Sequence, residues 1–491
     1  YQKGASVLRM LERYLGPAPF RAGIRRYLET HRFANTETAD LWDAIEQASG
    51  EPVRAVMDSW ILQGGFPLVS VSDRDETADV AGPTGATDAT ELALTQEPFA
   101  YSPVAEPKGD AASAIGEVWS VPVITRALDG GEGRALLEGP SGVVVVEGAK
   151  RGAPVVVNAG GAGYYRVLYT ADRQRQLAER ASELEPLERF NLVSDTWASV
   201  VAGRAEIGDF LSLAGALRDD DDPSVWAQVT GALSFLHHAV EPDTRDPLAR
   251  ATRALVAPTF ARLGWERRAD DGERTPTLRA QLLATLATIG EDAAVRAEAK
   301  QRLRAAGTGA NPLDPDLASA VLAAVASGGG RAEFDQFVEH YRHPATPQEE
   351  LRYLGALAAF RDPGLAERAF ELAIGEVRTQ NAPFVIMGLL GNTFTGPAAW
   401  ELVTQHWSEL TERIPDNLQA RMIDGVKLLC RDEGLAHRIR GFVAEHPLRT
   451  GQRTVDQTLE RLDVNVAFSK RLGDGRARHA LNATAEHLET H

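Results

Sequence analysis

Histidine pairs are the first candidates for chemistry in this sequence, because neutral imidazole rings bind transition metals. His340 and His343 are three residues apart in a predicted helix, so both could reach one metal ion. His237 and His238 are adjacent, and adjacent helical residues point to different faces. No H-E-x-x-H motif occurs in the 491 residues. We therefore interpret His340 and His343 as solvent-facing residues and expect no metal ligands in this chain.

Other reactive groups also have structural explanations. His487 and His491 are one helical turn apart, but they stand in a terminal segment that we expect to fray. The acidic run 219–222 precedes a helical pattern and is interpreted as favourable charge at a helix N-terminus, with a calcium site as a remote alternative. Cys430 is predicted in a buried helix, and no G-x-S-x-G motif occurs. The glycines at 160–163 precede a predicted strand instead of opening a helix, which argues against phosphate binding.

The composition limits the class of protein. A chain of 491 residues predicts two to four domains. The net charge of −17 disfavours nucleic acid or an anionic membrane as the main partner. No stretch approaches the ~20 consecutive apolar residues of a membrane-spanning helix. The single cysteine, Cys430, cannot form an internal disulfide, so we expect a reducing compartment and a cytoplasmic location.

Residues 1–64 are predicted to form a small helical unit, because apolar residues recur three or four apart. A turn at residues 1–4 is expected to enter the first helix, and Thr38 is expected to cap the third. Pro52 is expected in the first turn of the fourth. The predicted apolar faces are Val7, Leu11, Tyr14 and Leu15; Phe20, Ile24, Tyr27 and Leu28; Leu41, Trp42 and Ile45; and Val53, Val56, Met57 and Trp60.

Residues 65–157 change character. Short β-branched runs at 67–72, 118–128, 142–147 and 153–158 alternate with Gly, Pro and Asp clusters, which predicts a small β-sandwich. The polar stretch 72–90 is interpreted as a hairpin or surface insertion.

Residues 158–491 are predicted to be almost entirely helical after a strand at 164–170. Amphipathic segments recur in pairs about every 40 residues, which is typical of a HEAT-like α-solenoid. The predicted fold class is therefore multidomain α+β and mostly α: a small helical unit, a β-sandwich and a HEAT-like α-solenoid. Such a solenoid offers a concave wall but defines no function by itself.

Three short motifs carry a resemblance to a known family. They are a Y-x-K-G turn (Tyr1, Lys3, Gly4), a D-L-W helix (Asp40, Leu41, Trp42) and W-x-x-Q-x-G-F-P (Trp60, Gln63, Gly65, Phe66, Pro67). The sequence "NAGGAGYYRVLYT" adds a fourth motif at Asn158 and 163–169, although Leu168 and Thr170 depart from the polar residues usual there. Through these motifs the chain resembles the zinc aminopeptidases of the aminopeptidase N family. The resemblance extends over essentially the whole chain.

The resemblance implies a C-terminal fragment of an enzyme that removes N-terminal residues from peptides. In this family the zinc ligands and the loop that grips the substrate amine precede the Y-x-K-G turn, so a missing N-terminal catalytic part would hold the zinc. Tyr1 would be the last catalytic residue. Its phenol is a neutral hydrogen-bond donor at pH 7, suited to stabilising the oxyanion that forms when water attacks a peptide carbonyl.

We assign structural roles to the other matched residues. Lys3 is interpreted as an exposed charge and Gly4 as a site of close backbone approach. Gln63 is expected to hydrogen-bond the turn between domains, and Arg166 to anchor the sandwich to the first following helices through a carboxylate. Three further residues are expected to pack the junction between the helical unit and the sandwich: Trp60, Phe66 and Pro67.

Two other hypotheses stay open. One is a non-catalytic α-solenoid scaffold that binds peptides or proteins, and the other is a separate subunit that completes a zinc-bearing partner chain. An upstream reading frame encoding H-E-x-x-H would favour the fragment, whereas a start codon at this position would favour the alternatives. The sequence does not define the preferred N-terminal residue of a substrate.

Overall fold

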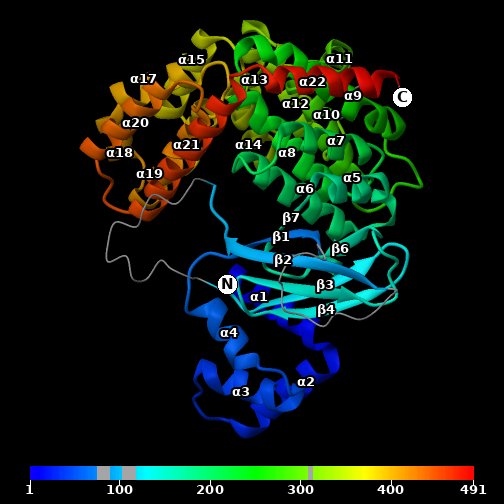
Figure 1. Ribbon diagram of the computed structural model, residues 1–491. Helices are drawn as coiled ribbons and strands as arrows, with labels where there is room; N and C mark the ends of the chain where they lie inside the picture. The colour runs from blue at the N-terminus through cyan, green and yellow to red at the C-terminus, as the bar shows by residue number, and fades with distance from the viewer. Residues whose placement is uncertain (75–88, 102–117, 308–312, 491) are drawn as a thin grey trace. The chain divides into compact units, whose positions relative to one another are not determined.

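The computed structural model describes residues 1–74, 89–101, 118–307 and 313–490. These residues form two compact units, Tyr1–Ala205 and Glu206–His491. The architecture is α+β and mostly helical, as predicted (Figure 1). Within the described ranges, no helix is both long and apolar enough to cross a membrane.

Four helices open the first unit. The predicted buried face of α1 is confirmed, because Val7, Leu11, Tyr14 and Leu15 are all buried. The helix already begins at Gln2, however, so the predicted entry turn through Gly4 is wrong. Glu37, instead of Thr38, caps α3 in a capping box. The four helices are α1 (Gln2–Leu15), α2 (Pro17–Thr30), α3 (Thr38–Ser49) and α4 (Val53–Ile61).

Two sheets follow in the first unit. One has the strand order β5-β2-β1-β7 and the other β4-β3-β6. All pairs are antiparallel except β1 with β7, which pair in parallel from Leu68–Arg166 to Val71–Tyr169. Inward-facing residues of both sheets and of α1, α3 and α4 share one apolar core. The strands are β1 (Pro67–Asp73), β2 (Thr90–Pro98), β3 (Val121–Ala127), β4 (Glu132–Leu137), β5 (Ser141–Val146), β6 (Val155–Val157) and β7 (Arg166–Tyr169).

Two of these strands were not predicted. β2 has few β-branched residues and buries the polar side chains Thr90 and Gln96, so its pattern looks like a loop. Gln96 fits because its amide donates to the Trp119 carbonyl (2.8 Å) and accepts from the Trp119 N–H (3.0 Å). β4 begins at Glu132, inside the Gly-rich cluster 128–134 that was interpreted as a break between strands. Most of the stretch 72–90 lies outside the described residues.

Helices end the first unit. The predicted strand at 164–170 appears as β7, which joins the first sheet and therefore extends that sheet beyond residue 157. Behind it come α5 (Ala171–Glu179), the 3₁₀ turn η2 (Ala181–Glu183) and α6 (Pro186–Val201), with the 3₁₀ turn η1 (Ala159–Gly161) before β7. α6 packs against β7 and η1.

The described residues of the second unit form helices and no strands. Pro258 lies inside α9, and this proline obscured the helix in the sequence pattern. The amphipathic segment predicted at 398–410 is divided between α17 and α18. The elements are α7 (Ile207–Ala216), α8 (Pro223–Ala239), η3 (Pro242–Thr244), α9 (Arg245–Leu263), α10 (Thr275–Thr288), α11 (Ala293–Gly307), α12 (Ala318–Gly328), α13 (Arg331–Arg342), α14 (Pro347–Leu357), α15 (Pro363–Gly375), α16 (Ala382–Leu390), α17 (Gly396–Gln405), α18 (Trp407–Arg413), α19 (Asp416–Met422), η4 (Ile423–Leu428), α20 (Glu433–Glu445), α21 (Gln452–Leu472) and α22 (Arg476–Thr490).

The last two helices return to the first helices of this unit. α22 packs against α7 and α9, and α21 packs against α8 (Figure 1). The Ser469 hydroxyl donates to the Ala239 carbonyl (2.6 Å), and Arg250 on α9 forms an ion pair with Glu489 on α22. The second unit therefore joins segments that are more than 200 residues apart in sequence.

Candidate functional site

Tyr1 stands at the N-cap position of α1. Its carbonyl accepts the Ala5 N–H (2.9 Å), as expected for the first turn of a helix. Its side chain is fully exposed, and its hydroxyl makes no hydrogen bond to a described residue. The phenol is thus free to meet a group from outside this part of the protein.

The helix behind Tyr1 is fixed at both ends. The Lys3 ammonium donates to the Gln63 carbonyl (3.1 Å) and to the Gly65 carbonyl (3.5 Å), just after α4. Lys3 is half-buried, so its interpretation as a freely exposed charge is wrong. The proposed close approach at Gly4 is also wrong, because a Cβ there would meet nothing within 4 Å among the described atoms. Near the other end, Arg134 lies over the Tyr14 ring (3.9 Å to its centroid).

The W-x-x-Q-x-G-F-P segment joins the helices to the sheets. The indole of Trp60 is fully buried and donates to the Ser120 carbonyl (3.0 Å). The Gln63 amide donates to the Val118 carbonyl (3.3 Å), which confirms its expected role in the turn. Phe66 stacks on Phe99 (5.5 Å between centroids), and it also contacts Tyr164 edge-on (5.7 Å). The predicted junction packing is confirmed for Trp60 and Phe66.

Arg166 connects β7 to α6, as predicted. Its guanidinium donates to Asp195 (2.8 Å) and to the Ser194 carbonyl (3.1 Å), while the Val167 N–H donates to the other Asp195 oxygen (3.0 Å). Burial outweighs these favourable contacts and raises the pKa of the Asp195 carboxyl to about 6. The Asp195 carboxylate therefore depends strongly on the Arg166 guanidinium to stay ionised in its buried position.

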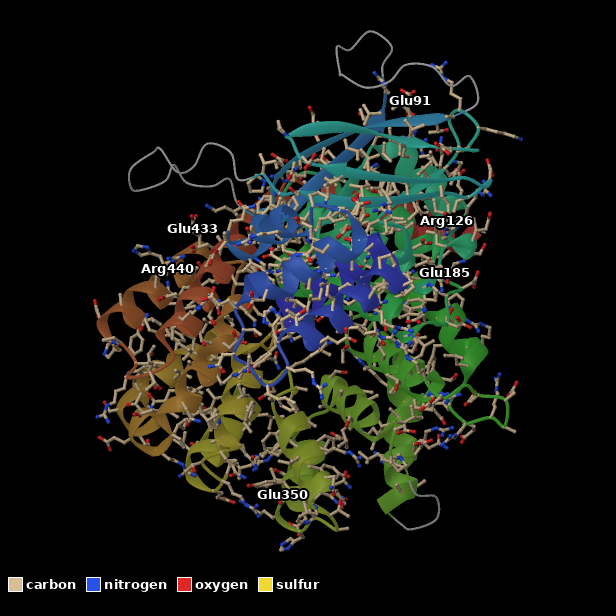
Figure 2. The ribbon with its side chains drawn as sticks, turned by 90° about the horizontal axis from the view of Figure 1, so that it is seen from below. Glu91, Arg126, Glu185, Glu350, Glu433 and Arg440 are labelled. Atoms are coloured by element: carbon tan, nitrogen blue, oxygen red, sulfur yellow. The ribbon has the colours of Figure 1, made fainter. Side chains whose placement is uncertain are left out.

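A second carboxylate on α6, Glu188, connects that helix to β3 and η1 but was not predicted. It accepts from Arg126 (2.6 Å), from the Gly160 N–H (2.9 Å) and from the Glu185 N–H (2.9 Å). Figure 2 labels two of these partners, Arg126 and Glu185. The signal was present in the sequence, since Glu185-x-x-Glu188 is a capping box in which each carboxylate accepts a backbone N–H. Gly161 explains the glycine run nearby, because a Cβ there would lie 2.5 Å from Leu187.

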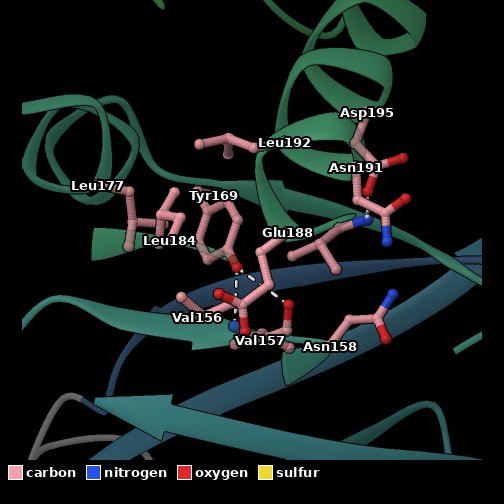
Figure 3. A pocket seen from close by; sticks show the side chains of 11 residues that line it. Val156, Val157, Asn158, Tyr169, Leu177, Leu184, Glu188, Asn191, Leu192 and Asp195 are labelled. Carbon is pink, nitrogen blue, oxygen red and sulfur yellow. Dashed lines mark hydrogen bonds between the residues drawn. The ribbon is translucent and has the colours of Figure 1, made fainter. Parts of the chain in front are cut away.

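A small cavity of about 20 Å³ lies between these residues, and Figure 3 shows its lining. Tyr169 closes one side, with its hydroxyl donating to the Val157 carbonyl (3.1 Å) and accepting from the Val157 N–H (2.7 Å). Burial raises the pKa of that phenol. A volume of this size holds about one water molecule, so the cavity is a packing feature and not a substrate pocket.

The candidate metal ligands do not come together. His340 stacks on Tyr353 (4.5 Å between centroids), while His343 lies 3.6 Å from the Glu339 carboxylate. His491, the partner considered for His487, lies outside the described residues. Among residues 1–74, 89–101, 118–307 and 313–490, no group of three or more His, Cys, Asp or Glu side chains is arranged to hold a metal ion.

The remaining candidates are structural. Asp222 caps α8 by accepting the Ser224 N–H (2.6 Å), which confirms the helix-terminus interpretation for this residue. Cys430 is buried as predicted, but it follows η4 instead of lying in a helix, and burial raises the pKa of its thiol to about 12. A protonated, buried thiol is a poor nucleophile.

The elements run from the Tyr1 helix through the two sheets to the helices of the second unit. Residues 154–464 match the ERAP1-like C-terminal domain, and residues 1–60 match the peptidase family M1 domain. The chain belongs to the ERAP1-like C-terminal domain family. The resemblance to aminopeptidases seen in the sequence motifs is thus confirmed.

Known relatives of this chain are named aminopeptidases. The chain is 26% identical to Aminopeptidase M1-A of Oryza sativa subsp. japonica, over 95% of this chain and 52% of that protein. It is 29% identical to Aminopeptidase 2, mitochondrial, of Saccharomyces cerevisiae, over 85% of this chain and 42% of that protein. It is 27% identical to glutamyl aminopeptidase of Rattus norvegicus, over 96% of this chain and 49% of that protein. The chain spans about half the length of the curated relatives it matches.

Proposed function

We propose that this chain is the C-terminal region of a zinc-dependent aminopeptidase that hydrolyses N-terminal residues from peptides. Within it, Tyr1 is the catalytic residue that donates a hydrogen bond to the developing oxyanion. The observation that carries the proposal is the match of residues 1–60 to the peptidase family M1 domain, together with the free phenol at the start of that match.

The chemistry of Tyr1 follows from its hydroxyl group. A phenol stays protonated at neutral pH and donates one hydrogen bond without bringing a charge. A fixed donor of this kind favours the transition state, in which the carbonyl oxygen is negative, over the neutral substrate. Lys3 and the buried face of α1 contribute by holding the helix that carries Tyr1.

The rest of the chain is proposed to shape the chamber around the substrate. The sheets form a sandwich that acts as a spacer, and the helical part of the chain after residue 157 forms a HEAT-like wall. The domain limits proposed for these roles are 1–64, 65–157 and 158–491. A preceding catalytic part would hold the zinc, which supplies Lewis-acid chemistry when bound. We propose a cytoplasmic location for the whole enzyme.

The experiment replaces Tyr1 with phenylalanine in the full-length zinc enzyme. We expect Tyr1→Phe to lower kcat about 10²–10³-fold with little change in KM, because the lost donor acts on the transition state. Tyr27→Phe on α2 is the matched control, since the Tyr27 hydroxyl makes an exposed hydrogen bond with Thr36 (2.7 Å) in the connection between α2 and α3. Equal turnover by Tyr1→Phe and the wild type would refute the catalytic role.

The isolated chain provides a second test. We expect residues 1–491 alone to hydrolyse no aminoacyl anilide and to bind no stoichiometric zinc after dialysis against the metal. Elemental analysis and a chromogenic assay measure both properties. Zinc-dependent turnover by the purified chain would contradict the assignment of the zinc ligands to another part.

A further inference from the structure

The first turn of α1, which carries Tyr1, has few local contacts that keep it in place. No described side chain caps its N-terminus, and the turn contains no acidic residue to offset the helix dipole. The first buried residue of the helix is Val7. Helix ends without such contacts fray, whereas an oxyanion donor must be fixed in position. The Tyr1 phenol therefore needs a contact between the first turn and another element.

Lys3 makes that contact. A cation in the first turn is opposed by the helix dipole, so its position there needs compensation from another element. The Lys3 ammonium donates to the carbonyls of Gln63 (3.1 Å) and Gly65 (3.5 Å), both in the connection between α4 and β1. The first turn of α1 is therefore tied to the end of α4.

The backbone stretch just before β3 holds the end of α4 in turn. The Gln63 amide donates to the Val118 carbonyl (3.3 Å), and the Trp60 indole donates to the Ser120 carbonyl (3.0 Å). The Ser120 N–H donates to the Ser59 hydroxyl (3.1 Å). Three neighbouring side chains at the end of α4 therefore bind one short piece of backbone.

Gln96 on β2 binds the middle of the same stretch. Its amide donates to the Trp119 carbonyl (2.8 Å), and its side-chain carbonyl accepts the Trp119 N–H (3.0 Å). Both side chains are buried. Backbone groups of all three residues, 118–120, are thus bonded to side chains. Because this stretch cannot shift without breaking several of these bonds, it is a firm anchor for α4.

We propose that residues 118–120 position Tyr1 through Gln63 and Lys3, which makes these two side chains positioning residues for the hydrolysis. The inference rests on the proposed function and goes beyond it, because the sheets then influence the reacting atoms instead of serving only as a spacer. Displacing a catalytic group by about 1 Å can cost about 10²-fold in rate. In this role Lys3 and Gln63 act only through Tyr1.

Steady-state kinetics of the full-length zinc enzyme test this inference. We expect Lys3→Met to lower kcat about 10–100-fold and Gln63→Leu about 3–10-fold. KM should change less than about 2-fold in each, because a misplaced donor affects the transition state and not the binding of substrate. Lys3→Arg, which keeps a charged donor, should retain most of the turnover. Gln47→Leu, at an exposed position on α3, is the matched control for Gln63→Leu.

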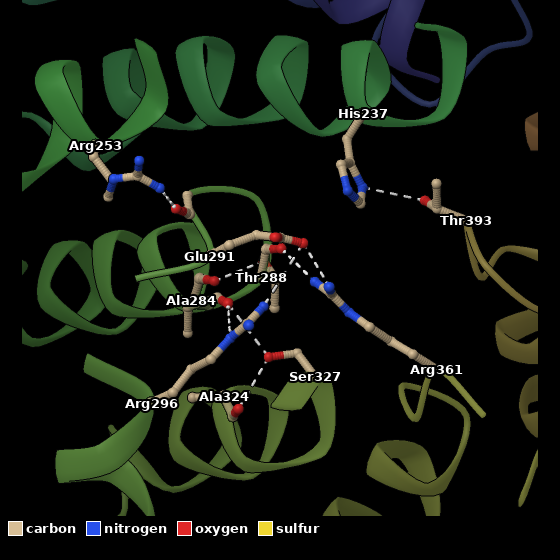
Figure 4. A network of polar contacts seen from close by, with 12 residues as sticks. His237, Arg253, Ala284, Thr288, Glu291, Arg296, Ala324, Ser327, Arg361 and Thr393 are labelled. Atoms are coloured by element: carbon tan, nitrogen blue, oxygen red, sulfur yellow. Dashed lines mark hydrogen bonds and ion pairs between the residues drawn. The ribbon is translucent and has the colours of Figure 1, made fainter. Parts of the chain in front are cut away.

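A polar network of the second unit provides a stability control (Figure 4). Arg296 on α11 donates to the Ala287 carbonyl (2.7 Å) at the end of α10, so Arg296→Gln should weaken helix packing and leave kcat unchanged. A loss of kcat equal to that of Lys3→Met would overturn the positioning role. Figure 4 also shows Thr393, whose hydroxyl lies 3.2 Å from Nδ1 of His237 and 2.9 Å from Nδ1 of His238. The expectation that these adjacent rings point apart is therefore wrong.

Double variants separate positioning from a general loss of stability. If Lys3 acts through Tyr1, adding Lys3→Met to Tyr1→Phe should lower kcat by less than about 2-fold more, since the phenol hydroxyl is already gone. The same factor in both backgrounds, or full turnover by Lys3→Met alone, would overturn the inference while the proposed function stands. Full turnover by Tyr1→Phe would refute the proposed function and this inference with it, so the two failures are distinguishable.

Discussion

His237 and His238 are kept neutral by their surroundings. Burial and the nearby arginines lower the pKa of His237 to about 3 and that of His238 to about 4; for His237, the adjacent ring adds to the effect. The groups that face this pair are Arg245, Arg361 and Arg431. Folding therefore excludes protons from these rings at a pH where the unfolded chain would take them up.

The stability of the second unit should consequently fall in acid. Below the unfolded pKa of 6.5, the unfolded chain binds more protons than the folded one, so the free energy of unfolding decreases as the pH falls toward 4. At pH 5 the loss relative to pH 7 is roughly 2 kcal/mol for each histidine. Urea unfolding, monitored through hydrogen exchange of the α8 amides, measures how the free energy of unfolding changes with pH.

Single variants identify the residues responsible. His238→Gln should flatten this pH dependence by about half, whereas His343→Gln should leave it unchanged because His343 is exposed. An unfolding free energy of the wild type that is the same at pH 5 and pH 7 would show that folding does not lower the pKa values of His237 and His238.

The ion pair between β7 and α6 supports an element-level prediction. Arg166→Gln leaves the buried Asp195 without its cation, and we expect a loss of about 3 kcal/mol in the stability of the first unit at pH 7. Removing the guanidinium raises the Asp195 pKa further, so the folded variant takes up a proton more readily than the unfolded chain. The loss should therefore shrink between pH 7 and pH 5. Chemical denaturation at both pH values tests this.

An exposed pair offers the contrast. Arg54→Gln breaks the ion pair with Asp43, in which both side chains are about half exposed, and should cost less than about 1 kcal/mol at either pH. A comparable loss in both variants would mean that burial of Asp195 is not what makes the first pair matter.

The elements also show which patterns a sequence reveals. Helices with a regular apolar face, such as α1, and β-branched strands, such as β5, were predicted because period and composition agree. β2 was missed because its buried Gln96 is stabilised by partners distant in sequence. His237 and His238 were misread for a related reason: Thr393, the hydroxyl they share, is contributed by a loop about 155 residues away. Local patterns predict elements, while polar contacts between distant elements need the fold.

At the scale of the whole molecule, the return of α22 to α7 and α9 is the main long-range contact of the second unit. Leu481 on α22 is fully buried. We expect Leu481→Ala to cost about 2–5 kcal/mol and to expose α9 and α22 together to limited proteolysis, because both sides of one contact lose packing. Mass spectrometry of the fragments identifies the cleavage sites.

Arg250→Gln is the comparison for that variant. It breaks only the exposed pair with Glu489, so its protease sensitivity should stay close to that of the wild type. Cleavage confined to α22 in Leu481→Ala would show that α9 does not depend on the returning helix.

The same return of α22 has a consequence for synthesis on the ribosome. Since α7 and α9 emerge long before α22, their apolar surfaces stay uncovered until translation of this unit is nearly finished. Most of its helices can stack on neighbours as they appear, but the final contacts must wait for the synthesis of α22. During that interval the nascent unit should be a client for chaperones, and slow codons before α22 would lengthen its exposure.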